Sequence, residues 1–175
     1  MQAEMKKLHL RNTFDPRHRS DLTKKDKAEL LESHMFLKQN IDGKIKGLKV
    51  AGGNKQRDFI SKEEASSPTV STEDFMFTFL IEAQENRDVS VINIPNAFIQ
   101  TKVEDKKDMV TIRVRIELVQ ALLDIDPKVY KPYVTKEKKG NLILLLQCLN
   151  AIYRTMITGL PLYKTFCKTL LREGF

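Results

Sequence analysis

The chain has 175 residues, of which 30% are charged and 41% hydrophobic, with 30 lysine and arginine residues against 23 aspartate and glutamate residues. This balance excludes a disordered tail and a membrane protein, and it is typical of one globular domain with its own core. The net charge of +7 suits a polyanionic partner without identifying it.

No apolar run approaches the roughly 20 residues that span a bilayer, and the first residues lack the apolar core of a secretory signal. We therefore expect an intracellular protein with no membrane partner. Cys148 and Cys167 fall in apolar helical patterns, which favour buried reduced thiols over a disulfide. His9, His18 and His34 lack the close spacing of a zinc site, so we expect no structural metal.

The N-terminal third predicts a lead-in followed by a hairpin. Residues 1–19 carry little pattern, and residues 22–31 predict a short surface helix that Asp21 or Thr23 could cap. Two strands, 35–38 and 44–50, flank the turn-forming residues Asn40 to Gly43, and a glycine pair then ends the second strand. We expect residues 1–32 to be the lead-in and residues 33–175 to be the main domain.

A polar loop over residues 61–70 leads to a helix that opens at Ser71-Thr72-Glu73-Asp74, where a hydroxyl can cap and acids suit the helix dipole. Apolar residues then recur around most of the circumference, so the pattern predicts a buried helix.

Residues 88–94 predict a strand, because branched apolar residues follow one another and Pro95 removes the next hydrogen-bond donor. Val89, Val91 and Asn93 would share one face. Asn93 would then lie at the carboxyl end of the strand, where a sheet can present a polar side chain to a ligand.

The second half predicts a charged connection over 102–108, a strand over 109–115 and a helix over 116–123. Asp124 and Asp126 could suggest a metal site, but a helix capped by Asp126 with Pro127 in its first position explains them better. Residues 130–136 and 142–146 predict a hairpin, and the pattern is helical from Gln147 onward, with Gly159 and Pro161 as breaks. Together these elements predict an α+β fold, with β-hairpins and a mainly antiparallel sheet packed by helices.

The central residues Asn93-Ile94-Pro95-Asn96-Ala97-Phe98-Ile99 resemble the first catalytic motif of copia-type reverse transcriptases, which reads Asp-(Ile/Val)-x-x-Ala-Phe-Leu. The resemblance implies an N-terminal fingers and palm part of an RNA-directed DNA polymerase from a retrotransposon. Asn93 stands where the family has an aspartate that binds Mg²⁺. Phe98 stands where reverse transcriptases place an aromatic against the sugar of the incoming nucleotide, although it is equally explained as a core aromatic.

The predicted hairpin resembles the fingers strand of this family, with matches at Lys46, Val50, Ala51, Gly53 and Gln56. Leu48 stands where the family has arginine. The resemblance implies that Lys46 contacts the incoming nucleotide and that Lys49, Lys55 and Arg57 contact nucleic acid, since phosphates require fixed positive charge. A solvated rim is the alternative for these basic residues.

Two further blocks match. Ser67-Pro68-Thr69-Val70 is similar to a structural Ser-Pro-Thr/Val-Val segment of the family. Tyr153, Tyr163 and Gly174-Phe175 match a later block, whereas Arg154, Ile157 and Gly159 replace its glycine, glutamine and proline. The resemblance therefore covers most of the chain, from about residue 36 to residue 175, in the order in which the family has these blocks.

Nucleotidyl transfer by two metal ions needs several carboxylates, and an amide is a much poorer ligand for a hard cation. Here the first aspartate is Asn93, and the 175 residues contain no Asp-Asp pair. We therefore expect no cofactor and no polymerase activity from this chain, and we expect the missing C-terminal half of the polymerase as a partner if a longer product exists. Two alternatives are a non-catalytic module that binds RNA or DNA, and a relic without a selected role whose apolar strand 142–146 lacks neighbours and invites aggregation.

Overall fold

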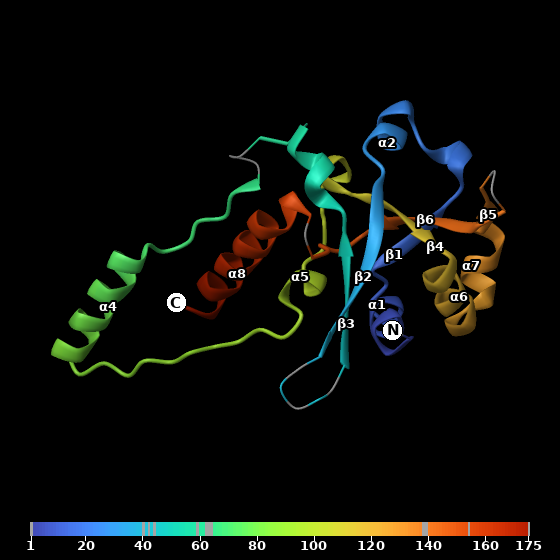
Figure 1. Ribbon diagram of the computed structural model, residues 1–175. Helices are drawn as coiled ribbons and strands as arrows, with labels where there is room; N and C mark the ends of the chain where they lie inside the picture. The colour runs from blue at the N-terminus through green and yellow to red at the C-terminus, as the bar shows by residue number, and fades with distance from the viewer. Residues whose placement is uncertain are drawn as a thin grey trace.

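The computed structural model of the protein describes residues 2–39, 41, 43, 45–58, 60, 61, 65–137, 140–153 and 155–174, and at residues 35–38, 45–50, 107 and 157 it describes the backbone without the side chains. Within this part of the chain a mixed sheet has the strand order β1-β6-β4-β2-β3, with β5 paired to β6 (Figure 1). The strands are β1 (Phe14–Arg17), β2 (Leu31–Gln39), β3 (Ile45–Ala51), β4 (Thr111–Arg115), β5 (Thr135–Lys136) and β6 (Leu142–Cys148).

Strands β2 and β4 are parallel, with Leu31 opposite Ile112, and the other strand pairs of this sheet are antiparallel. The predicted α+β class is confirmed at this level, while the fingers and palm arrangement stays a prediction. The predicted hairpin is confirmed as well, because β2 pairs with β3 from Gln39 opposite Ile45 to Ser33 opposite Ala51. Strand β3 ends at the expected glycine pair.

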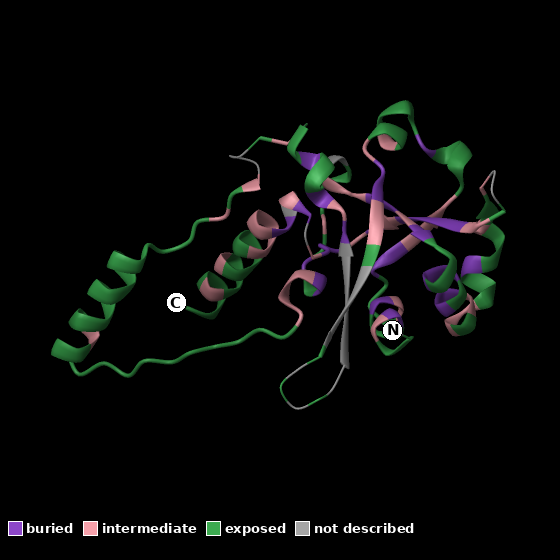
Figure 2. Ribbon diagram, in the orientation of Figure 1, coloured by how far each residue is buried: buried purple, intermediate pink, exposed green. Residues whose placement is uncertain are grey.

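The core lies between the sheet and two helices, α1 (Gln2–Leu10) and α6 (Ile116–Ile125). The alternation of β4 places Ile112 and Val114 on one face, and both are completely buried. They form one cluster with buried side chains of β6, α1 and α6, as Figure 2 shows at the crossing of these elements. Members of the cluster from those three elements are Leu144, Leu146, Met5, Leu8, Leu118, Val119, Ala121 and Leu122.

The first 32 residues contribute to this core. Met5 and Leu8 are buried on α1, and β1 pairs with β6 with Phe14 opposite Cys148. Helix α2 (Lys24–Ala28) begins as predicted at Thr23, whose hydroxyl accepts a hydrogen bond from the Asp26 amide. The division of the chain at residue 32 stays a prediction, but α1 and β1 pack on the sheet that follows them.

The elements around α6 follow the sequence pattern. The predicted strand over 109–115 forms β4, and the predicted helix over 116–123 forms α6. Asp126 then caps α7 (Pro127–Tyr130), because its side chain accepts hydrogen bonds from the amides of Lys128 and Val129. The cap explains this carboxylate without a metal ion.

The prediction of a strand over residues 88–94 is wrong. These residues have no regular secondary structure, and Val91 is 94% exposed. In the described part of the chain no strand pairs with them, so their backbone groups face water instead of a ladder. Asn93 is consequently exposed in an irregular segment and not at the end of a strand. The chain becomes regular again at α5 (Ala97–Gln100).

The burial predicted for the helix after Ser71 is also wrong, although the helix itself forms. Helix α4 (Thr72–Gln84) begins at Ser71, whose hydroxyl accepts a hydrogen bond from the Asp74 amide, yet it has no buried residue. Figures 1 and 2 show it standing away from the sheet, with an exposed surface and extended chain on both sides.

The C-terminal third departs from its prediction in three places. Residues 131–133 form a short 3₁₀ helix, η4 (Lys131–Tyr133), so only two residues of the expected first hairpin strand pair with β6. Strand β6 continues to Cys148, and residues 149–153 and 155 are not helical where a helix was expected. The helix α8 (Gly159–Glu173) begins at the predicted break and follows η5 (Met156–Thr158).

Strand β6 does not lack neighbours, because β1, β4 and β5 pair with it and residues 143–146 are buried. The expected aggregation hazard of this strand is therefore absent from the folded chain. Cys148 is buried on β6 and Cys167 is half-buried on α8, and neither forms a disulfide. Among the helices that the structure describes, none has the length and apolar character needed to cross a bilayer.

Candidate functional site

Four segments that are far apart in the sequence meet beside the sheet, in what we call the junction: residues 51–56, the loop at Ser67, α5, and residues 149–153 with 155–159. The Ala51 amide donates a hydrogen bond to the Tyr153 carbonyl over 3.2 Å. The Met156 amide donates to Oε1 of Gln56 over 2.8 Å. A methyl group on Gly159 would meet the Ser67 hydroxyl at 3.1 Å, so the loop packs closely on the start of α8.

Helix α5 joins the junction through both its backbone and an aromatic ring. The Asn150 side chain donates a hydrogen bond to the Ile99 carbonyl over 2.6 Å, and the Ala151 amide donates to the Thr101 carbonyl over 2.9 Å. The ring of Phe98 meets the ring of Tyr153 edge to face, with centroids 5.3 Å apart and planes at 82°. This geometry is favourable for two aromatic rings in contact.

The local sequence explains why α5 begins where it does. Pro95 has no amide hydrogen, and Asn96 takes a left-handed conformation with φ of 54°, which asparagine tolerates better than most residues. The side chain of Gln100 then donates a hydrogen bond to the Pro95 carbonyl over 2.7 Å, which closes the turn. Phe98 is half-buried in the result, so part of its ring remains accessible.

The structure places the predicted site residues in four different settings. Phe98 lies in the junction, whereas Asn93 lies in the exposed segment that precedes it. Lys55 and Arg57 are exposed on the 3₁₀ helix η2 (Gly53–Asp58), on either side of the buried Gln56. The side chains of Lys46 and Lys49, those of the family departures Leu48 and Ile157, and the whole of Arg154 lie outside the described part of the chain.

Gln56 is one of the family matches, and the resemblance assigns it no role. In the structure Gln56 is almost fully buried and ties η2 to η5 through the Met156 amide. Because its neighbours Lys55 and Arg57 are charged, the sequence gives no indication that Gln56 is buried. A buried glutamine whose oxygen accepts a hydrogen bond fixes the local backbone. Here it fixes η2, which carries the exposed side chains of Lys55 and Arg57 beside the junction.

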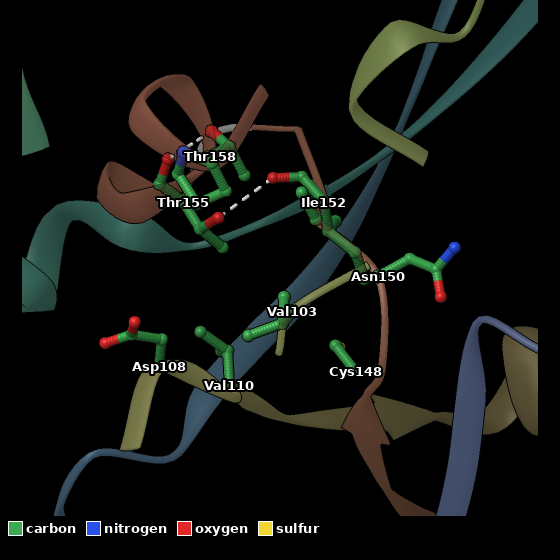
Figure 3. Close-up of a pocket in the computed structure, with 10 residues that line it drawn as sticks. Val103, Asp108, Val110, Cys148, Asn150, Ile152, Thr155 and Thr158 are labelled. Carbon is green, nitrogen blue, oxygen red and sulfur yellow. Dashed lines mark hydrogen bonds between the residues drawn. The ribbon is translucent and has the colours of Figure 1, made fainter. Parts of the chain in front are cut away.

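A small cavity borders the junction (Figure 3). Its volume is about 10 Å³, which leaves room for one water molecule and no nucleotide. The hydroxyls of Thr155 and Thr158 donate to the carbonyls of Ile152 and Thr155, so these polar groups are occupied locally. The remaining lining is mainly apolar, with Val103, Val110, Cys148, Ala151 and Pro161 among its residues.

A larger cavity of about 350 Å³ lies on another part of the sheet, and the sequence predicted nothing there. Arg17 and Lys106 line it together with Asp21 and Asp26, so its charges balance and favour neither sign of ligand. Arg17 already donates to Gln147 over 2.7 Å and pairs with Asp15. Residues 13–22 carry no recognisable motif, so the sequence gives no signal for this cavity.

Acidic side chains on the sheet are neutralised by arginines. Arg113 of β4 lies 3.4 Å from Glu32 and 3.1 Å from Glu137, and Arg115 lies 3.2 Å from Glu32. In the described residues no three histidine, cysteine, aspartate or glutamate side chains are grouped as a metal site would require. The single amide of Asn93 is exposed and neutral, so the residues present do not fit the Mg²⁺ that the family resemblance implies.

Four separated segments thus meet around Phe98 and Tyr153, and the basic side chains of Lys55 and Arg57 are exposed beside them. Comparisons with protein-family models, with curated proteins and with solved structures find no match for this chain.

Proposed function

We propose that the chain is the N-terminal fingers and palm part of a copia-type reverse transcriptase, and that by itself it does not polymerise DNA. One observation carries the proposal. Four of the sequence blocks that resemble the family meet in the junction, although they are spread from Ala51 to Gly159. The contacts among these blocks support the proposal, because the first catalytic motif, the fingers strand and the later block would then lie in one region of the fold.

Within this proposal Phe98 is the residue that would face the sugar of a nucleotide, and Lys55 and Arg57 would meet phosphates. The absence of polymerase activity follows from charge. Two metal ions need carboxylates from separate segments, and Asn93 offers a neutral amide. Because each 1.36 kcal/mol lost from transition-state stabilisation costs about tenfold in rate, losing the metal ions abolishes measurable synthesis.

The test of inactivity is extension of a DNA primer on an RNA template, with Mg²⁺ or Mn²⁺, by the purified chain. We expect no extension, and we expect Asn93→Asp to leave the result unchanged because one carboxylate cannot hold two ions. An active reverse transcriptase in the same buffer is the control. Template-dependent extension by the unmodified chain would contradict the proposal.

A second candidate function is a non-catalytic module that binds RNA or DNA. It is favoured by the exposure of Lys55 and Arg57 beside the junction and by the net charge of +7. Binding to phosphates releases counterions, so affinity should fall steeply with added salt. We expect this binding whether or not the chain descends from a polymerase.

Fluorescence anisotropy with a labelled RNA–DNA hybrid measures this binding over a range of salt concentrations. Lys55→Gln with Arg57→Gln should weaken binding and reduce the slope of log affinity against log salt by about one for each phosphate that the variant no longer binds. Lys128→Gln with Lys131→Gln is the matched control, since it removes the same charge from exposed positions on α7 and η4. Equal weakening in both double variants would show that binding is not located at η2.

A further inference from the structure

Helix α4 is apolar around most of its circumference, yet none of its side chains is buried. Phe77 is 64% exposed and Leu80 is 67% exposed. Its polar surface is a narrow stripe of Asp74, Thr78 and Glu82, which are four residues apart and share one side of the helix. A helix with so much apolar surface is typically buried, but no described part of the chain covers this one.

Helix α8 has the same property on a smaller scale. Leu160, Tyr163, Leu170 and Leu171 share one face, and no residue of the helix is buried. Leu171 is 74% exposed. Its basic residues Lys164, Lys168 and Arg172 are again four residues apart, so they form a stripe along one edge of the apolar face.

The two helices are complementary in charge and length. The charged residues of α4 are all acidic, namely Glu73, Asp74 and Glu82, whereas α8 carries three basic residues and one acidic residue. Their 13 and 15 residues give lengths of about 20 and 22 Å. Apolar faces bordered by opposite charges favour contact between α4 and α8.

One neighbouring helix cannot cover α4. Phe75 and Phe79 lie on one side, with ring centroids 4.6 Å apart, while Phe77 and Ile81 lie on the opposite side. Closing α4 onto α8 of the same chain would bury one of these sides and leave the other in water. In a four-helix arrangement each helix has two neighbours, which satisfies both sides.

We propose that two copies of the chain associate through α4 and α8, so that α4 of one protomer packs on α8 of its partner. The acidic stripe of α4 then faces the basic stripe of α8, and the two α4 helices bury their remaining apolar side against each other. The exposed, irregular residues 68–70 and 87–94 connect α4 to the rest of the chain (Figures 1 and 2). In this arrangement they span the distance to the partner.

Sedimentation velocity of the full chain over a wide concentration range tests the association. We expect a dimer, and we expect Phe77→Gln with Leu80→Gln to raise the dissociation constant by about tenfold or more. Leu10→Gln is the matched control, because Leu10 is 69% exposed but lies on α1, and it should leave the dimer intact. A chain that stays monomeric at every concentration would overturn the proposal. Protection of the α4 amides from hydrogen exchange in that monomer would show that α4 is covered within its own chain.

A charge reversal provides a test that does not remove apolar surface. Lys164→Glu with Lys168→Glu on α8 should weaken the dimer, and adding Glu82→Lys in the same chain should restore part of the affinity. Lys128→Glu with Lys131→Glu should have no effect, since these residues lie on α7 and η4. Equal weakening by both pairs, without rescue by Glu82→Lys, would show that α8 does not face α4.

Discussion

Strand β6 and residues 88–94 are both rich in branched apolar residues, but they lie in opposite environments. Leu144 and Leu146 of β6 are completely buried, whereas Ile92 is 75% exposed. Strand β6 has backbone partners in β1 and β4, while residues 88–94 pair with no described strand. Burying a backbone without hydrogen-bond partners costs more than its apolar side chains return. The difference shows that burial depends on a neighbouring strand as much as on side-chain character.

The largest expected effect comes from shortening one apolar side chain in each of the two regions. Leu144→Ala should lower the free energy of unfolding by about 2–5 kcal/mol, because it empties a filled part of the core. Ile92→Ala should change it by less than about 0.5 kcal/mol, because the side chain is largely in water. Urea unfolding followed by circular dichroism measures both. A similar loss for the two variants would mean that residues 88–94 form the buried strand that the sequence predicts.

A second test compares two glutamines. Gln56→Ala should cost about 1–3 kcal/mol, because it leaves the Met156 amide without its acceptor in a half-buried position. Gln84→Ala, at the exposed end of α4, should cost almost nothing. The same unfolding assay applies. Equal and small effects would show that the Gln56 hydrogen bond does not hold the junction to the sheet.

A third test concerns the contact between α1 and α7. The Tyr130 hydroxyl lies 2.9 Å from Nδ1 of His9, and burial, with the charge of Asp126, raises the pKa of Tyr130 from 10.0 to about 12. The folded state therefore favours the protonated phenol, so this contribution to stability is complete below pH 10 and is lost between about pH 10 and 12. Tyr130→Phe should cost about 1 kcal/mol at neutral pH.

Thermal unfolding at a series of alkaline pH values measures this effect. The unmodified chain should lose stability more steeply above pH 10 than the variant does. Parallel curves would exclude Tyr130 as the source of the alkaline loss.

The smallest expected effects come from two helix caps. Thr23→Ala should cost about 1 kcal/mol, because Thr23 and Asp26 satisfy each other's amides where α2 joins the buried Leu22 and Leu30. Ser71→Ala should reduce the helicity of α4 while leaving the unfolding of the sheet unchanged, since α4 has no buried residue. Circular dichroism and urea unfolding separate the two outcomes. An equal shift of the unfolding midpoint would mean that α4 is part of the core.

The Thr23 cap also has a pH dependence. Hydrogen bonds from Thr23 hold the pKa of Asp26 below its usual 3.8. Its contribution is therefore present above that pH and is lost as the pH falls through the lowered pKa. Urea unfolding at a series of acidic pH values should therefore show a smaller loss of stability on acidification in Thr23→Ala than in the unmodified chain.

Local chemistry was predictable wherever a few neighbouring residues decide the outcome. The caps at Thr23, Ser71 and Asp126, the hairpin of β2 and β3, and the alternation of β4 all follow from the sequence. Each depends on hydrogen bonds or side-chain periods that span a few residues. The sequence also predicted Phe98 and Gln56 as members of blocks that the structure brings together.

Tertiary structure alone decided which apolar segments are buried and where the junction forms. The role of α1 in the core, the exposure of α4 and of Asn93, and the irregular path of residues 149–153 have no local signal. They depend on which backbone groups find partners at long range: β6 found β1 and β4, while residues 88–94 found no described strand. Side-chain pattern states what a segment can bury, and the available neighbours determine whether it does.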